Sequence, residues 1–183
     1  SQGICFPVSI LPIGDYVEGQ DLTEFLGVIK YEPPIPACLA GKIKGGFPSF
    51  IPKTDEPRIQ TCPEVLEKYR NLEFYATEKI DGTSMTIFVK DGKLEICSRR
   101  LWLAFEPDNS YWKVAQEMNL LEKLKSVENK YAIQGELSGE GIQKNIINIH
   151  GQKLFVFNIY DYFAGKYLEW GKVKQICFDW DLE

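Results

Sequence analysis

The stretch from Thr83 to Arg99 reads TSMTIFVKDGKLEICSR, and its pattern decides the fold. On each side of Asp91-Gly92, apolar residues alternate with other residues, as in strands whose two faces differ. The Asp-Gly pair is typical of a two-residue hairpin turn, in which both central residues take a positive φ. We therefore predict an antiparallel hairpin whose strands cover residues 83–90 and 93–99.

The turn also sets the register of this hairpin, because Lys90 and Lys93 face each other across it. One face then pairs Val89 with Leu94, Ile87 with Ile96, and Met85 with Ser98. The other face pairs Phe88 with Glu95, Thr86 with Cys97, and Ser84 with Arg99. In this register Arg99 returns to the residues that precede Thr83.

Directly before the hairpin stands Lys79-Ile80-Asp81-Gly82, at the end of the apolar run Phe74 to Glu78, which we interpret as a strand. A lysine at a strand end is usually a solvated charge. Lysine is also the amine that burial and neighbouring cations most readily turn into a nucleophile. The short motif decides nothing alone, since a solvated lysine before an Asx-Gly turn has the same pattern. Asp81 either holds a metal-bound water or only shapes the Gly82 turn.

The rest of the chain predicts an α+β fold with mostly antiparallel strands. Further strands are expected at 4–13, 131–137, 154–160 and 173–178. Helices are expected at 22–28 behind an Asp21 cap, at 63–70, and from Asn109 or Ser110 to about Lys125. Residues 31–58 are rich in Pro and Gly, which indicates an extended connector between two packing units.

Composition excludes several classes of protein. The 183 residues are 44% hydrophobic and 13% aromatic, which allows a sizeable core and excludes a disordered chain. The net charge of -5 argues against a protein coated for polyanions, but leaves room for a local basic groove. Five scattered cysteines without C-x-x-C spacing indicate a reducing intracellular compartment, cytoplasmic or nuclear. No stretch is long enough to span a membrane, and no leader is visible.

Three later segments supply groups that can act with Lys79. Arg99 ends the hairpin, Glu136 follows Gly135 on a strand face, and Phe157 lies on a later strand. An attack on a nucleotide α-phosphate requires a neutral amine, cations or Mg²⁺ for the phosphate charge, and an aromatic face for the base. Each residue also has a plainer interpretation. Arg100 can replace Arg99, Glu136 can serve as a turn acceptor, and Phe157 can belong to the core.

On these residues the sequence resembles the covalent nucleotidyltransferases, the superfamily of polynucleotide ligases and mRNA capping enzymes. Within it, the chain looks like the ATP-dependent, nick-sealing RNA ligases that carry an N-terminal OB-type domain. Lys79-Ile80-Asp81-Gly82 matches motif I, Ser98-Arg99 the arginine motif, Gly135-Glu136 motif III, and Phe155 to Asn158 motif IIIa. Three further segments also resemble this branch: Ser1 to Pro12, Lys30 to Lys53 (from Lys30-Tyr31-Glu32-Pro33-Pro34 through Phe50-Ile51-Pro52-Lys53), and Gly139 to Asn145.

The resemblance implies that ATP adenylylates Lys79, that Arg99 contacts the ribose or phosphate, and that Phe157 stacks on adenine. It also implies nucleotide contacts for Glu78, Ile80, Gly82 and Glu136, and Mg²⁺ or Mn²⁺ held through water by Asp81 and Glu136. Lys53, Lys144 and Asn145 are candidates for RNA contacts. The implied reaction seals 3′-OH and 5′-phosphate ends of RNA through lysyl-AMP and an adenylylated RNA, in a monomeric protein.

The implied domains are the end of an OB-type domain (1–30), the connector (31–60) and the N-terminal part of an ATP-grasp-like nucleotidyltransferase domain (61–183). Motif IV, a carboxylate-Gly strand, and motif V, a lysine pair, are expected downstream, and neither occurs before Glu183. Lys172 and Lys174 stay unassigned because they follow Phe157 too closely. Two alternatives remain open: a catalytically incomplete nucleotide- or RNA-binding fragment, and a DNA ligase or GTP-dependent capping-type enzyme.

Overall fold

The structure is a computed structural model that describes residues 6–29 and 41–183. Within these ranges the chain divides into two compact units, residues 6–29 with 57–70 and residues 41–56 with 71–183. Two segments that carried part of the resemblance, Ser1 to Gly3 and Lys30 to Pro34, lie outside the described residues.

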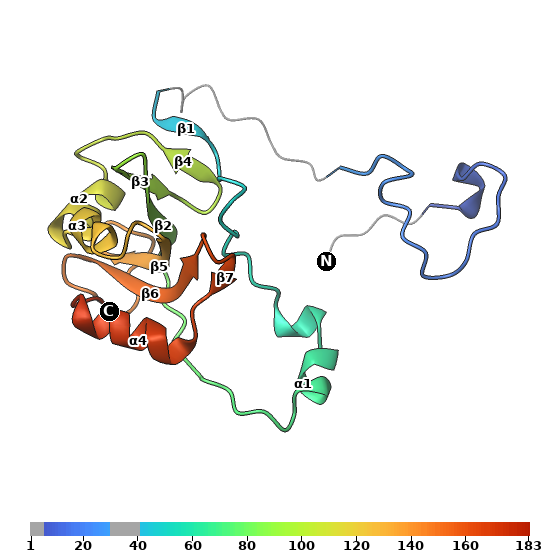
Figure 1. Cartoon of the computed structure of the whole chain (residues 1–183). Helices are drawn as coiled ribbons and strands as arrows, with labels where there is room; N and C mark the ends of the chain where they lie inside the picture. Colours follow the sequence, from blue (N-terminus) through green and yellow to red (C-terminus); the bar gives the residue numbers. More distant parts are fainter. Residues whose placement is uncertain (1–5, 30–40) are drawn as a thin grey trace. The chain divides into compact units, whose positions relative to one another are not determined.

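The described part of the larger unit is built on a seven-stranded sheet whose neighbouring strands are antiparallel (Figure 1). The strand order is β1-β4-β3-β2-β5-β6-β7. The strands are β1 (Ile43–Gly46), β2 (Thr83–Lys90), β3 (Lys93–Cys97), β4 (Leu101–Leu103), β5 (Tyr131–Gly139), β6 (Gln152–Asp161) and β7 (Lys166–Tyr167). The helices are α2 (Ser110–Glu117), α3 (Leu120–Lys125) and α4 (Trp170–Asp179). This architecture confirms the predicted α+β class.

The predicted hairpin is present as β2 and β3. Its cross-strand pairs run from Lys90↔Lys93 at the turn to Thr86↔Cys97, in the predicted register. Asp91 and Gly92 have φ values of 51° and 72°, as this turn requires. The two outermost predicted pairs, Met85 with Ser98 and Ser84 with Arg99, do not form. β3 ends at Cys97, and a hydrogen bond from Ser98 N to Leu101 O turns the chain into β4.

One face of the sheet, here called the helix face, packs against α2, α3 and α4 (Figure 1). Most of its strand residues are buried, and Met85, Ile87, Ile96, Leu137 and Ile159 have 0% exposure. The helices contribute Val114, Leu124 and Val173 to the same cluster. Side chains at i and i+2 share one face of a strand, so the alternation that predicts the hairpin also selects its core face.

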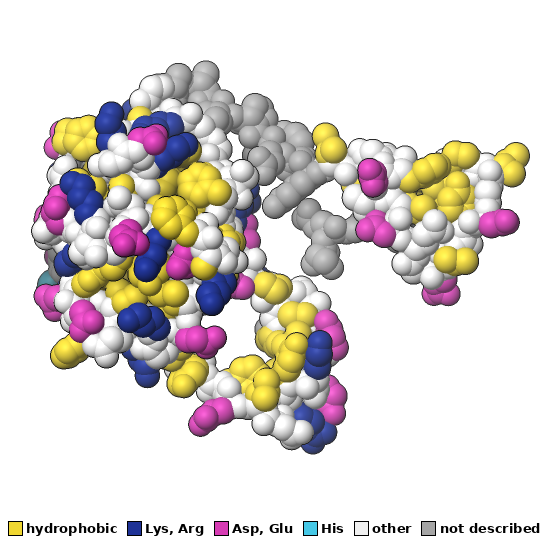
Figure 2. Space-filling model, viewed as in Figure 1, with side chains coloured by type: hydrophobic (Ala, Val, Ile, Leu, Met, Phe, Trp, Pro, Cys, Tyr) yellow, Lys and Arg dark blue, Asp and Glu magenta, His cyan; other side chains and the backbone are white. Residues whose placement is uncertain are grey.

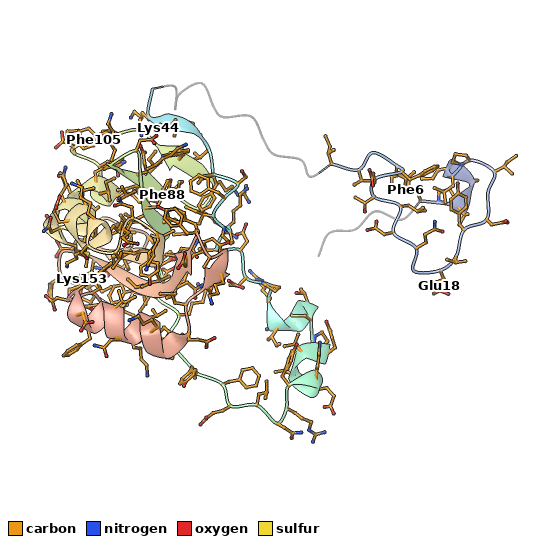
Figure 3. The ribbon with its side chains drawn as sticks, in the orientation of Figure 1. Phe6, Glu18, Lys44, Phe88, Phe105 and Lys153 are labelled. Atoms are coloured by element: carbon orange, nitrogen blue, oxygen red, sulfur yellow. The ribbon has the colours of Figure 1, made fainter. Side chains whose placement is uncertain are left out.

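The opposite face, here called the open face, has a smaller core made of Ile51, Phe88, Cys97 and Ala132. Ile51 belongs to residues 47–55, a segment that lies on this face and is here called the strap. The Phe50 and Phe88 rings meet edge-on at 5.5 Å, and the Gln134 side chain donates to Pro52 O at 2.8 Å. Figure 3 shows Phe88 among the packed side chains of this unit.

β1 and the strap fall within the range that the sequence indicates as a connector. β1 pairs with β4, and Phe47 N donates to Arg100 O at 2.9 Å where the strap begins. The sequence does not indicate this packing, because β4 and Arg100 are far from these residues in the chain and the Pro and Gly content is typical of a loop.

Two expectations in the larger unit are corrected by the structure. Residues 173–178 belong to helix α4 and not to a strand, because Trp170, Val173 and Cys177 reach the core at helical spacing. The helix expected from Asn109 to Lys125 is divided into α2 and α3, since Asn119 takes a left-handed φ of 51°. The Asn109 cap is confirmed: its side chain accepts from Tyr111 N at 2.9 Å.

The described part of the smaller unit contains only short elements: the 3₁₀ turns η1 (Val8–Ile10) and η3 (Ile59–Thr61) and the helix α1 (Glu64–Lys68). α1 confirms the helix expected at 63–70. Residues 6–13 contain η1 in place of the expected strand, since their prolines lack the N–H that strand pairing needs. The helix expected at 22–28 is absent: residues 23–27 form a turn, although Asp21 accepts from Thr23 N as a cap would. The assignment to an OB-type domain stays a prediction.

The surface of the larger unit mixes charges of both signs in the view of Figure 2, where Lys and Arg lie among Asp and Glu. None of the helices in the described ranges is both long and apolar enough to cross a membrane.

Candidate functional site

Lys79 lies in an irregular segment that leads into β2. Residues 73–82 have no regular secondary structure, so the strand end expected at Lys79 is absent. The Phe74 and Tyr75 side chains are 63% and 70% exposed, which shows that this run is not a buried strand. The Lys79 and Asp81 side chains are exposed, and Glu78 and Ile80 flank the lysine.

The Asp81-Gly82 turn is held against β5. Ser138 Oγ donates to Asp81 O at 2.7 Å, and the Gly82 N–H is hydrogen-bonded to the Glu136 carboxylate. A Cβ at Gly82 would collide with the Leu137 carbonyl and lie 3.0 Å from the Ser138 Cβ. Glycine is therefore required at this position by the close approach of two backbone segments.

Glu136 is the centre of the arrangement. It lies on the open face, where it pairs with Ser84 of β2 and Phe155 of β6. Burial raises the pKa of Glu136, the positive charge of Lys79 and the Gly82 N–H lower it, Asp81 raises it, and Arg99 lowers it. Lys79, Asp81 and Arg99 are therefore all close enough to act on one carboxylate.

Arg99 lies in the turn between β3 and β4, where it contacts the strap. Its Nε donates to Asp55 Oδ1 at 2.7 Å, and its Nη2 lies 2.6 Å from the same oxygen. Arg99, the residue favoured by the sequence, is the arginine whose charge acts on Glu136. The backbone of Arg100 is used instead to accept from Phe47 N.

Phe157 occupies a bulge in β6. Gln134 pairs with Asn158 and Gly135 pairs with Val156, so Phe157 is the extra residue between them. The Phe157 side chain is half-buried and belongs to neither apolar cluster of the described residues. The β strands approach closely here, since a Cβ at Gly135 would lie 2.5 Å from Phe155 O. The absence of Phe157 from both clusters of the described residues does not support its interpretation as a core residue.

The residues expected to hold a metal are two carboxylates, Asp81 and Glu136. Within the described ranges, no group of three or more His, Cys, Asp or Glu side chains could hold a metal ion. Mg²⁺ commonly keeps several waters and binds through one or two carboxylates together with substrate phosphates. This donor set therefore fits a metal ion that arrives with a nucleotide and keeps its water, and does not fit a permanent protein cage.

The three candidates for RNA contacts lie in two places. Lys53 is part of the strap, next to Thr54. Lys144 and Asn145 lie in the loop after β5, where Lys144 is exposed. The Asn145 side chain both donates to Ile149 O at 3.0 Å and accepts from Ile149 N at 2.9 Å, so it closes its own loop.

Sequence reasoning missed two groups near the site. Asp55 gave no signal, because its partner Arg99 is 44 positions away. Tyr111 comes from α2, and its hydroxyl hydrogen-bonds Thr83 Oγ1 at 2.8 Å where β2 begins. Burial raises the pKa of Tyr111, the Thr83 hydrogen bond lowers it, and the charge of Glu136 raises it.

The chain is similar to RNA ligases both in sequence and in structure. The sequence model of the RNA ligase family matches residues 72–182. A comparison with curated proteins gave no match. A solved structure of a Naegleria gruberi RNA ligase variant with ATP and Mn matches with a TM-score of 0.73 and 36% identity, over 89% of this chain and 48% of that chain. Structures of the same ligase with PPi, and of a variant with AMP and Mn, match at 37% identity with equal TM-score and coverage. The chain thus spans about half the length of these solved ligases.

Proposed function

The chain belongs to the RNA ligase family, and from this we propose that it is the nucleotide-activating part of an ATP-dependent RNA ligase. Lys79 Nζ attacks the α-phosphorus of ATP, the bond to the leaving pyrophosphate breaks, and a phosphoramide bond to AMP forms. AMP then passes to a 5′-phosphate of RNA, and a 3′-hydroxyl displaces it to form the phosphodiester. The substrates are the 3′-OH and 5′-phosphate ends at a nick or break.

The observation that carries this proposal is the packing of the Asp81-Gly82 turn, which follows Lys79, against the strand of Glu136. The charges of Lys79, Asp81 and Arg99 all act on the Glu136 carboxylate. The hydrogen bond from Ser138 and the close packing of Gly82 fix the backbone two and three residues after the nucleophile, which limits the positions that Lys79 can take. Arg99 supplies donors for ribose or phosphate oxygens, as arginine commonly does. Glu136, which faces the same space, accepts from ribose hydroxyls or from metal-bound water.

The base site is proposed to use Phe157. A bulge re-aims a side chain away from the regular spacing of the strand, and an aromatic ring offers a face on which a base can stack. Glu78, Ile80 and Gly82 complete the nucleotide contacts. A Mg²⁺ or Mn²⁺ held by Asp81 and Glu136 would neutralise phosphate charge when bound. Lys53, Lys144 and Asn145 are proposed to contact the RNA.

The cellular compartment, the domain division and the oligomeric state of the protein are further proposals. Cys62, Cys97 and Cys177 are free thiols, which supports a reducing intracellular compartment, cytoplasmic or nuclear. We further propose that residues 1–30 belong to an OB-type domain, that residues 61–183 belong to the nucleotidyltransferase domain, and that the protein acts as a monomer.

Label transfer from ATP labelled in the α-phosphate tests the nucleophile. The 183-residue chain is expected to form a covalent AMP adduct that Lys79→Ala abolishes. Lys172→Ala is the control, since Lys172 is an exposed lysine on α4. Undiminished labelling of Lys79→Ala would remove the assignment.

A second candidate function is binding of nucleotide or RNA without complete transfer. The chain spans about half the length of the solved ligases, so the activity of the 183 residues is tested directly. This alternative predicts ATP binding without a covalent adduct, and robust labelling of the chain contradicts it. Comparing ATP with GTP as the label donor, and nicked RNA with nicked DNA as the acceptor, separates an RNA ligase from its DNA-ligase and capping-type relatives.

A further inference from the structure

The strap brings a side chain to the candidate site from outside residues 72–182, the range that the sequence model of the family matches. This side chain is Asp55. Asp55 Oδ1 accepts from Arg99 Nε at 2.7 Å and lies 2.6 Å from Nη2. One carboxylate oxygen therefore holds one edge of the guanidinium that is assigned to the nucleotide.

The position of Asp55 is fixed by the sheet. Thr54, its chain neighbour, shares a hydrogen bond of 2.9 Å between its Oγ1 and Ser84 Oγ. Ser84 is the residue that pairs with Glu136 in the β2–β5 ladder. Ile51, further back in the strap, is only 2% exposed. Thr54 thus attaches the strap to Ser84, which pairs with Glu136, and Asp55 next to it holds Arg99.

The Asp55–Arg99 pair is not placed to stabilise the fold. The Arg99 side chain is 63% exposed and the Asp55 side chain 36% exposed, and ion pairs in water contribute little to stability. An arginine side chain without a partner samples many rotamers, and the entropy lost when a ligand orders it weakens binding. A carboxylate that holds the guanidinium beforehand removes part of this cost.

We propose that Asp55 is a positioning residue that orients Arg99 for the nucleotide. This inference rests on the proposed function. A guanidinium has five N–H donors, and the Asp55 contact uses the edge formed by Nε and Nη2. The Nη1 group on the other edge keeps its donors for a phosphate or ribose oxygen of ATP. The alternative is a latch, in which Asp55 blocks Arg99 until the nucleotide displaces it. In that case, removal of the Asp55 carboxylate makes labelling faster.

The test compares lysyl-AMP formation in the 183-residue wild type with that in Asp55→Asn, Arg99→Gln and the double variant. Asp55→Asn is expected to raise the ATP concentration for half-maximal rate of adduct formation roughly tenfold, with little change in the maximal single-turnover rate, because it loosens a group that contacts the nucleotide before reaction. The double variant is expected to be no worse than Arg99→Gln alone, since Asp55 acts through Arg99. Asp55→Glu, which restores the charge, is expected to recover part of the loss. Glu122→Gln is the control, because it breaks another exposed pair, with Lys125 on α3.

A second readout is the Nε–H resonance of Arg99 in ¹⁵N NMR spectra, assigned by its loss in Arg99→Gln. Asp55→Asn is expected to shift it and to speed its exchange with water. An unchanged resonance overturns the inference, as does faster labelling or effects that add in the double variant. A wild-type chain without any adduct contradicts the proposed function instead, and the resonance still shows whether Asp55 holds Arg99.

Discussion

The two faces of the sheet are made by the same strands and have opposite properties. The helix face is an apolar layer in which strand residues such as Ile87, Ile133 and Leu137 have no exposed surface. The open face carries polar side chains in the same strands, among them Ser84, Gln134 and Glu136, and is covered in part by the strap. Stability therefore depends mostly on the helix face, whereas the candidate site lies on the open face, beside its smaller apolar core. The four substitutions below test this division.

The largest effect on stability is expected for Ile87→Ala on the helix face. Ile87 is fully buried between β3, β5 and the helices, and truncation of such a residue leaves a cavity. The free energy of unfolding is expected to fall by about 2–5 kcal/mol. Urea unfolding monitored by Trp fluorescence measures it. Ile146→Ala, at a side chain that is 72% exposed, is the matched control. A loss at Ile87 no larger than that at Ile146 would contradict the division of the two faces.

Gly82→Ala is expected to have the next largest effect, and to act on both properties. Its Cβ would push the turn away from Leu137 and Ser138 of β5, which costs about 1–3 kcal/mol of stability. The same displacement moves Lys79 relative to Glu136, so label transfer is expected to fall more steeply than stability. Gly45→Ala is the control, since nothing lies within 4 Å of a Cβ there. Equal labelling by the two variants would show that the turn does not position Lys79.

The sequence was most informative where the interacting residues are close together in the chain. The hairpin register follows from alternation and one Asp-Gly turn, and it holds from Lys90 to Thr86. It was uninformative where a contact joins distant positions, as in the strap, whose Pro52 meets Gln134 at a separation of 82 residues. α4 was mistaken for a strand because a window of six residues, Val173 to Phe178, is too short to distinguish periods of 2 and 3.6.

The candidate site shows the same limit. The structure brings Lys79, Asp81 and Arg99 to Glu136, in agreement with the grouping that the sequence indicates. Asp55 and Tyr111 escaped notice, since an isolated carboxylate or tyrosine carries no motif and its role is decided only by its partner. The metal, base and RNA contacts stay predictions.

Glu136→Gln is expected to produce a smaller change in stability, with a sign that depends on pH. Burial raises the pKa of Glu136 above its ordinary 4.5, so the folded protein favours the protonated form and loses stability as pH rises through the raised value. The variant has no such loss. It is expected to be more stable than the wild type at pH 7, by less than about 1 kcal/mol, because solvent screens this partly exposed group. The difference should disappear below pH 4.5.

Thermal unfolding of wild type and Glu136→Gln between pH 3 and pH 8 measures this difference. Glu117→Gln, an exposed carboxylate on α2, is the control and is expected to show little change in Tm at any pH. Label transfer by Glu136→Gln is expected to fall even where its stability rises. A variant that is less stable than the wild type at pH 7 would show that the carboxylate serves the fold and not the site.

The smallest effect on stability is expected for Thr86→Val, at the residue next to Ile87. Thr86 is as fully buried as Ile87 but points to the open face, beside Gln134. Its Oγ1 has no hydrogen-bond partner in the described part of the chain, and neither has Gln134 Oε1. A buried hydroxyl without a partner destabilises the folded state, so Thr86→Val is expected to change the free energy of unfolding by less than about 0.5 kcal/mol or to increase it. A loss above about 1 kcal/mol in urea unfolding would reveal a buried water between Thr86 and Gln134, and so a polar interior beneath the strap.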